Sequence, residues 1–353
     1  MNIVIVTDAW HPQVNGVVRT LEKVIERLRQ WGHRVDVFSP DQFRSLPCPS
    51  YPEIRLGLTR SGSIGRKIAK LRPDAVHLST EGPLCWSARR WCLKNNVPYT
   101  SAYHTQFPQY AAKRTGLPER VFWPLIRRFH GPSHAIMVST NSIGDALRSN
   151  RLDHIVRWSR GVDQAQFRPD ATPPTEFANL PRPIQLYVGR VAVEKNIEAF
   201  LKTKERGSKV IVGDGPALDA LRVRYPRAHF LGRKSGRDLA ACYAHADVFV
   251  FPSRSDTFGL VIIEALACGT PVAAFPVSGP IDILSDGTGA MDEDLDIAID
   301  RALGLHPADC IALAKSYSWE ASARQFLDAL VPIETVIRPT MDMPFVTRRE
   351  LPA

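Results

Sequence analysis

Short apolar runs alternate with segments of helical periodicity along this chain, and they do so in two successive series. The first series opens with an apolar run at residues 2–8, continues with helical spacing of apolar residues over 18–30, and returns to an extended pattern at 34–39. Such alternation is typical of parallel sheets that are covered by helices on both faces. We therefore expect an α/β protein.

The two series are separated by a stretch with five prolines between residues 169 and 183. The expected strands are 75–78, 99–103 and 135–138 in the first series, and 185–188, 209–212, 228–231, 248–251 and 271–274 in the second. The prediction is two doubly wound, Rossmann-like domains, residues 1–168 and 184–330, that face a central cleft, followed by a tail at 331–353. In such sheets ligands bind at the carboxyl ends of the strands.

Composition supports a folded interior and excludes a membrane-spanning protein. The chain has 353 residues, 44% of them hydrophobic, and its longest apolar stretch, 260–277, is interrupted by Glu264, Gly269 and Pro271. Residues 1–10 resemble a first buried strand more than a signal peptide. The six cysteines show no metal-binding spacing and are typical of reduced, buried thiols. These features favour the cytoplasm.

The net charge of +9 is unevenly distributed. Residues 1–160 hold 24 basic and 11 acidic residues, whereas the remainder holds 21 and 25. A nucleic acid, an anionic membrane surface and plain solubility are all compatible with a basic first half.

Two glycine-containing turns follow expected strands of the second series. Gly189 and Arg190 come directly after one strand, with Lys195 five residues later. Two cations there suit a pyrophosphate, whose developing charge they would neutralise as a bond breaks; ordinary surface charge is the alternative. After the next strand, Gly213 and Gly215 allow close approach to a base or ribose, or form a common turn.

The loop after the first strand contains Asn15 and Gly16 immediately before a helix. Backbone amides at a helix start suit an anionic or hydroxyl-bearing ligand. The pattern is not the glycine fingerprint of dinucleotide-binding enzymes, which disfavours an NAD enzyme, and an ordinary turn is equally compatible.

The segment with the most chemical information is residues 247–275. An expected strand ends at Phe251, and a helix is expected from about Leu260, with Asp256 in the intervening loop and Glu264 in the second helical turn. Both carboxylates can face one pocket and accept bonds from sugar and ribose hydroxyls, while the amides of 258–261 face phosphates. The alternative is a helix cap by Ser253 or Asp256 and a surface glutamate.

This segment resembles the retaining glycosyltransferases of family four, which have the two-domain GT-B fold. The family pattern PSxxExFGxxxxEAxAxGxPV is matched from Pro252 to Val272, and the 189–195 element, the SRGVD sequence at 159–163 and the GDGP sequence at 213–216 follow in family order. One position departs: the first glutamate of the pattern is Asp256 here. The shorter carboxylate changes the reach toward a donor sugar, so exact sugar contacts do not carry over.

The resemblance implies a nucleotide-sugar donor and a front-face reaction in which the departing phosphate helps to deprotonate the acceptor. It implies no protein nucleophile, no cofactor and no metal, since Arg190 and Lys195 supply the positive charge. The implied catalytic residues are His104, Arg190, Lys195 and Glu264. The implied donor-binding residues are Gly16, Gly189, Gly213, Gly215, Asp256, Phe258, Gly259 and Leu260. His104 matches a family histidine near the reacting sugar; a core histidine is the alternative.

The acceptor is expected to be a lipid. Residues 80–110 resemble the subgroup of the family that makes glycolipids, including sulfoquinovosyl-, glucuronosyl- and mannosyl-transferring enzymes. Residues 116–131 combine aromatic and basic side chains, and Phe122, Trp123, Arg127 and Arg128 are expected to contact the membrane or the acceptor. A core helix with arginines at one edge is the alternative. A second basic cluster lies at 60–72.

The leading hypothesis is therefore a hexosyltransferase that moves a hexose or hexuronic acid from UDP-glucuronate, UDP-glucose or UDP-galactose to a membrane lipid such as diacylglycerol. It would be peripherally associated with the inner face of the cell membrane. The first alternative is a GDP-mannose-dependent alpha-mannosyltransferase acting on a lipid or polysaccharide. A nucleotide-sugar epimerase and a basic nucleic-acid-binding module receive little support, because the family-four pattern opposes the first and no nucleic-acid motif supports the second.

Overall fold

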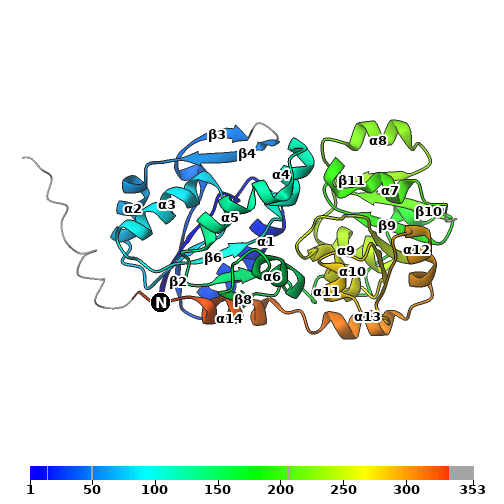
Figure 1. The fold of residues 1–353 in the computed structure, drawn as a ribbon. Coiled ribbons are helices and arrows are strands. Elements are labelled where there is room, and N and C mark those ends of the chain that lie inside the picture. Colours follow the sequence, from blue (N-terminus) through cyan, green and yellow to red (C-terminus); the bar gives the residue numbers. More distant parts are fainter. Residues whose placement is uncertain (14, 49–50, 205–206, 334–353) are drawn as a thin grey trace, which may run out of the picture.

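The computed structural model describes residues 1–13, 15–48, 51–204 and 207–333, which form two α/β units side by side (Figure 1). The first unit contains a six-stranded parallel sheet with the order β2-β1-β5-β6-β7-β8. Its strands are β1 (Asn2–Val6), β2 (Arg34–Phe38), β5 (Ala75–Leu78), β6 (Thr100–Tyr103), β7 (Ile136–Val138) and β8 (Ile155–Arg157). An antiparallel hairpin of β3 (Arg44–Cys48) and β4 (Tyr51–Leu58), which the sequence patterns did not indicate, lies beside it.

The second unit contains another six-stranded parallel sheet, with the order β11-β10-β9-β12-β13-β14. Its strands are β9 (Ile184–Val188), β10 (Ser208–Val212), β11 (His229–Gly232), β12 (Val248–Phe251), β13 (Val272–Ala274) and β14 (Gly289–Met291). Both sheets are doubly wound, as expected. The eight further strand ranges expected from the sequence agree with the structure to within one residue at each end.

Helices cover both faces of each sheet because alternate strand residues point to opposite sides. In β1, Val4 and Val6 pack in a core that contains α2 and α3, whereas Ile3 and Ile5 pack with α1 and α14. The helices of the first unit are α1 (Gly16–Gln30), α2 (Ser61–Lys70), α3 (Pro83–Lys94), α4 (Phe107–Thr115), α5 (Trp123–His130) and α6 (Asn141–Arg148).

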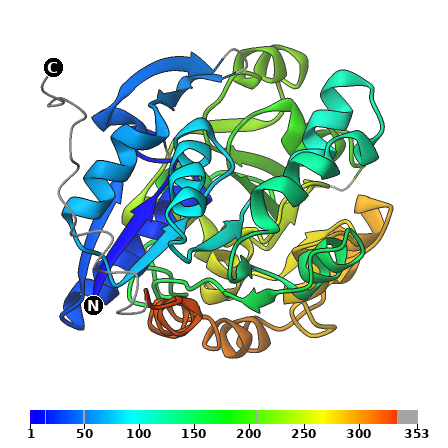
Figure 2. The ribbon, with the colours of Figure 1, turned by 60° about the vertical axis from the view of Figure 1, so that its left-hand side comes forward.

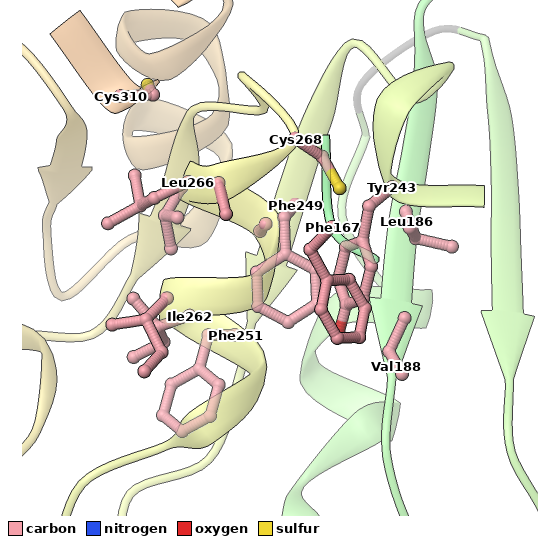
Figure 3. Packing of buried hydrophobic residues seen from close by; sticks show 14 of the residues in the cluster. Phe167, Leu186, Val188, Tyr243, Phe249, Phe251, Ile262, Leu266, Cys268 and Cys310 are labelled. Atoms are coloured by element: carbon pink, nitrogen blue, oxygen red, sulfur yellow. The ribbon is translucent and has the colours of Figure 1, made fainter. Parts of the chain in front are cut away.

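The second unit is built in the same way around a core of aliphatic and aromatic side chains. Figure 3 shows Phe249, Tyr243 and Phe167 packed together between the sheet and α10. Its helices are α7 (Ile197–Leu201), α8 (Leu218–Arg224), α9 (Gly236–Ala244), α10 (Leu260–Ala267), α11 (Pro280–Ile283), α12 (Leu295–Leu303) and α13 (Pro307–Ala314). Phe167, just before the proline-rich stretch, and Phe177, within it, are both buried in this core.

The last described helix, α14 (Trp319–Ala329), returns to the first unit. Phe326 is buried against Trp158 and His77, with ring centroids 5.0 and 4.9 Å apart, and Ala323 joins the same core. Figures 1 and 2 show α13 and α14 following one another where the chain passes from one unit to the other. The domain boundaries expected from the sequence stay predictions, but this helix, inside the expected range 184–330, packs with the first unit.

The expected tail at 331–353 lies mostly outside the described residues. Its first part is attached to the first unit, since Ile333 is buried and its amide donates to the carbonyl of Asp74 at 2.7 Å. None of the helices in the described ranges combines the length and apolar character needed to cross a bilayer.

Candidate active site

The order of the strands places two loops of the second unit at one position. The strand order reverses between β9 and β12, which are parallel neighbours in the sheet, so the loops that follow them run to opposite faces and leave a crevice at the carboxyl ends of these strands. The first loop contains Gly189, Arg190 and Lys195. The second loop, residues 252–259, leads into α10 and is called the donor loop below.

Lys195 and Asp256 form an ion pair across these two loops, with 2.6 Å between Nζ and Oδ1. Burial alone lowers the pKa of Lys195, but the Asp256 carboxylate, the Tyr110 phenol and the hydrogen bond together raise it above its ordinary value. The lysine therefore remains charged at neutral pH. The second oxygen of Asp256, Oδ2, and the hydroxyl of Ser253 are both buried without a hydrogen-bond partner. Since buried polar groups are normally bonded, these two atoms are open to hydroxyl groups of a ligand.

Glu264 lies one full turn inside α10 and makes a separate set of contacts. Its buried carboxylate pairs with Arg19 of α1 and accepts a hydrogen bond from the Tyr243 hydroxyl at 3.1 Å. Burial raises the pKa of Glu264, whereas the Arg19 charge and the two hydrogen bonds oppose that rise. Asp256 and Glu264 thus pair with different cations, Lys195 from the second unit and Arg19 from the first. The sequence had suggested that both carboxylates face one pocket and had given neither a partner.

Arg19 was not anticipated from the sequence, although a signal was present. It follows Gly16 by three residues at the start of α1, so its side chain points along the first turn toward the carboxyl edge of the sheet. Its guanidinium also lies 5.6 Å from the ring centroid of Phe167. A cation in the first turn of a helix that begins at a sheet edge is a usable indication of a site.

The start of α1 differs from the expected anion site. The side chain of Asn15 accepts hydrogen bonds from the amides of Val17 and Val18, both at 3.0 Å, so these donors are already used. Gly16 instead lies at the contact between the units, where a β-carbon would be 3.6 Å from Leu260. No side chain caps α10, which begins after Gly259 in a left-handed conformation with φ of 89°. The uncapped helix start is on the donor loop.

His104 follows β6 at the carboxyl edge of the first sheet and contacts the donor loop. Its carbonyl accepts a hydrogen bond from the Thr257 hydroxyl at 2.8 Å, and its Nδ1 lies 3.1 Å from Nη2 of Arg160. Burial and the nearby Arg160 charge lower the pKa of His104 well below its ordinary value. The imidazole is therefore neutral at pH 7. Its role near the sugar stays a prediction.

Further hydrogen bonds hold the donor loop against the first unit. The backbone carbonyl of Thr257 accepts from Ser139 at 2.9 Å, and that of Asp256 accepts from Gln106 at 3.2 Å. Ser142, at the start of α6, donates to Asp282 on α11 through its amide at 2.9 Å and its hydroxyl at 2.5 Å. Phe258 is buried beneath this contact. The structure is therefore that of two units in direct polar contact.

The GDGP sequence packs against the loop of the expected phosphate clamp. A β-carbon on Gly213 would lie 1.8 Å from the carbonyl oxygen of Gly189, and one on Gly215 would lie 2.4 Å from that of Val191. Glycine is required at both positions because the two backbones touch. The expectation that these residues also approach a base or ribose stays a prediction.

The aromatic and basic stretch 116–131 is divided differently from the expectation. Trp123, expected at the membrane, is 6% exposed and packs in the core with Ile126, and Phe122 is half-buried. Trp123 falls on the inner face of α5 because its neighbours at helical spacing are apolar and cover the sheet. The exposed large apolar side chains of this stretch are Leu117, Val121 and Leu125.

Comparison with known proteins agrees with this site. Residues 14–166 match the model of Glycosyltransferase Family 4, and residues 182–304 match that of the glycosyl transferases group 1. A GDP-mannose-dependent alpha-mannosyltransferase of Mycolicibacterium smegmatis is 32% identical over 309 residues, covering 81% of this chain and 82% of that protein. The chain is a member of glycosyltransferase family 4. It is accordingly a hexosyltransferase, as the sequence predicted.

Other members of family 4 and several solved structures are also similar. Sulfoquinovosyl transferase SQD2 of Arabidopsis thaliana is 30% identical over 77% of this chain and 59% of that protein, and an alpha-monoglucosyldiacylglycerol synthase of Streptococcus pneumoniae is 28% identical over 78% and 71%. Sucrose-phosphate synthase of Thermosynechococcus elongatus superimposes with a TM-score of 0.74 at 20% identity, covering 93% of this chain and 98% of that one. The predicted GT-B fold is confirmed.

Within the described ranges, no three or more His, Cys, Asp or Glu side chains are grouped as a metal site would require. The expectation that this family-4 enzyme needs neither metal nor cofactor is untested and stays a prediction, as do the individual roles of the residues at the site.

Proposed function

We propose that this family-4 enzyme transfers a hexose or hexuronic acid, with retention of configuration, from a nucleotide-sugar to a lipid at a membrane surface. The observation that carries the proposal is the combination, in one molecule, of a cation-lined donor loop in the second unit and an exposed apolar and basic surface on the first.

The donor side rests on charge and on open hydrogen-bonding groups. Lys195, together with Arg190 and the uncapped start of α10, supplies positive potential for a diphosphate at the switch point of the sheet. Asp256 Oδ2 and Ser253 Oγ are open to sugar hydroxyls. Glu264, deeper in α10 and ion-paired with Arg19, is proposed to accept from a ribose hydroxyl.

The acceptor side rests on the surface of α4, α5 and the short turn between them. Four large apolar side chains in this region are exposed, Phe107, Leu117, Val121 and Leu125. The exposed basic side chains of the same segment are Arg114, Arg120 and Arg128. Apolar groups that enter a bilayer interface beside arginines that meet anionic headgroups are the chemistry of peripheral membrane binding. We call these seven residues the apolar–basic surface.

A hollow of about 520 Å³ on the first unit is a candidate for the acceptor. It lies where β4 leads into α2 and beside the first turn of α3, and its lining is both apolar and polar. The lining residues are Leu58, Thr59, Arg60, Ser63, Pro83 and Ser87. Such a lining suits the glycerol and headgroup region of a lipid. Pro83 is close in sequence to the carboxyl end of β5, beside the switch point of the first sheet.

UDP-sugars are the leading donors in this proposal, and GDP-mannose is the second candidate. The specific observation in favour of GDP-mannose is that mannosyltransferases named for this donor are 32% and 30% identical to the chain. The observation in favour of a lipid acceptor with another sugar is the similarity to SQD2 and to monoglucosyldiacylglycerol synthases.

A donor screen tests the proposal. Purified protein is incubated with vesicles of phosphatidylcholine, phosphatidylglycerol and diacylglycerol, and with radiolabelled UDP-glucose, UDP-galactose, UDP-glucuronate or GDP-mannose in separate reactions. Label in the organic phase from one UDP-sugar is expected, with the anomeric configuration of the product read by NMR. Label from GDP-mannose alone would select the second candidate, and no organic-soluble product from any donor would reject a lipid acceptor.

A further inference from the structure

Arg160 is a buried cation next to the candidate sugar site, and the SRGVD sequence in which it lies gave no reason to assign it a role. It is 5% exposed. Its guanidinium donates to the carbonyl oxygens of Trp158 at 2.6 Å and Ser159 at 3.2 Å, and it lies 4.5 Å from the Trp158 ring centroid. These contacts fix the guanidinium plane and leave Nη2 directed at the ring of His104.

The contact with His104 restricts where that ring can carry its proton. Nη2 of Arg160 lies 3.1 Å from Nδ1 of His104. A guanidinium has hydrogen-bond donors and no acceptor, so Nδ1 must accept and cannot be protonated. A neutral imidazole carries one proton, which is then on Nε2. The Trp158 ring, edge-on at 5.4 Å, packs against the same imidazole.

The other ring nitrogen is left without a partner. Nε2 of His104 is buried and has no hydrogen-bond partner among the residues that the structure describes. Because Nδ1 is occupied by Arg160, the Nε2–H group is a buried donor at the carboxyl end of β6. The carbonyl of the same residue accepts a hydrogen bond from Thr257 of the donor loop, so this donor lies beside that loop. A buried donor without a partner indicates a ligand oxygen.

We infer that Arg160 is a positioning residue: it holds His104 in the tautomer with its proton on Nε2 and so presents a hydrogen-bond donor to a sugar oxygen of the nucleotide-sugar. The identity of that partner rests on the proposed function, whereas the tautomer does not.

The tautomer is measured directly on the free protein. Protein labelled with ¹⁵N-histidine is examined by long-range ¹H–¹⁵N correlation near neutral pH, and the His104 signals are assigned by their loss in His104→Gln. The protonated and bare nitrogens of a neutral imidazole have well-separated shifts. A protonated Nε2 and a bare Nδ1 are expected; a protonated Nδ1, an imidazolium or a mixture of tautomers would overturn the inference.

Two substitutions of Arg160 separate positioning from packing. In Arg160→Met the Nδ1 donor is lost, so a mixture of tautomers and an about tenfold lower kcat are expected, with the KM for the donor little changed. Arg160→Gln keeps a neutral donor and is expected to restore much of the Nε2–H form. Arg157→Gln, on β8 and bonded to Asn141 at 2.9 Å, is the matched control and should leave the His104 spectrum unchanged. An unchanged tautomer in Arg160→Met would overturn the positioning role, even if its melting temperature falls.

The ligand contact is tested by adding UDP-glucose or GDP-mannose to the labelled protein while binding is followed by calorimetry. A shift of the Nε2 signal by the sugar nucleotide that exceeds the shift by UDP or GDP alone is expected. Equal shifts with a bound sugar nucleotide would overturn the contact to the sugar. If neither sugar nucleotide binds, the proposed function fails, and the tautomer measurement still decides the role of Arg160.

Discussion

The two sheets have matching switch points, but the helices that begin there differ in how their first amides are capped. At the first switch point Asp8 accepts from the amides of Leu84 and Cys85 at 2.9 and 3.1 Å, and Asn15 caps α1. In the second unit α10 has no side-chain cap, and Ser253 Oγ and Asp256 Oδ2 are buried without partners. Capped amides stabilise a fold, whereas an uncapped helix start can meet an anion, so the comparison favours the proposed donor site in the second unit.

The largest effect is expected from Lys195. In Lys195→Ala the Asp256 carboxylate loses its cation and a diphosphate loses a charge-assisted bond. We expect kcat/KM to fall about 100- to 1000-fold, measured with the donor that gives product in the vesicle assay. Lys202→Ala, an exposed lysine paired with Glu198 at 3.1 Å, is the matched control. Retention of full activity in Lys195→Ala would contradict the proposal that this lysine binds the diphosphate of the donor.

The next effect concerns Arg19, a cation that the first unit contributes to the second. In Arg19→Met the buried Glu264 carboxylate loses its ion pair, and we expect the free energy of unfolding to fall by about 2 kcal/mol, less than for a fully buried pair because Arg19 is partly exposed. Arg27→Met, an exposed position on the same helix bonded to Gln30, serves as the control. Denaturant unfolding measures both.

The same pair predicts a dependence on pH. Burial raises the pKa of Glu264 in the folded protein above its ordinary value of 4.5. The folded state therefore loses stability as the pH rises from 4.5 through this raised pKa, because the buried carboxyl must then ionise, and the Arg19 charge reduces that loss. The stability difference between the native protein and Arg19→Met should therefore be larger at about pH 8 than at about pH 5. A difference that is constant or larger in acid would show that Glu264 is not the group Arg19 stabilises.

A smaller effect is expected at the apolar–basic surface. Replacing Leu117, Val121 and Leu125 by serine removes exposed apolar side chains, so the affinity for vesicles containing phosphatidylglycerol should fall about tenfold while nucleotide binding is unchanged. Val223→Ser, 83% exposed on α8 of the second unit, is the control. Equal loss in the control, or no loss in the triple variant, would contradict a membrane contact through the first unit.

The smallest effect sharpens the difference between the helix starts. In Asn15→Ala the amides of Val17 and Val18 lose their cap, which should cost about 1 kcal/mol in the free energy of unfolding. UDP or GDP binding, followed by calorimetry, should be unchanged because these amides serve the fold. A marked change in nucleotide affinity would instead indicate that the start of α1 binds an anion, as the sequence had suggested.

Several features were predictable because neighbouring residues determine them. The alternation of short apolar runs with helical spacing predicted the strands and the order of the two units. The loop between β12 and α10 was also predicted, because Phe251 ends an apolar run and α10 begins nine residues later, after Gly259. Aromatic and basic composition at 116–131 was not enough, because composition does not say which face of α5 is inward. Packing against the sheet buried Trp123 and left Leu125 exposed.

The sequence by itself thus determined the α/β class, the membership of family 4 and the position of the loops expected to bind the donor, since each follows from periodicity or from residues close together in the chain. Only the tertiary structure decided the partners: Arg19 for Glu264, Arg160 for His104, and α14 for the first sheet. Each of these contacts joins residues far apart in sequence, and its geometry depends on how the helices and strands pack in three dimensions, which no local pattern of side chains encodes.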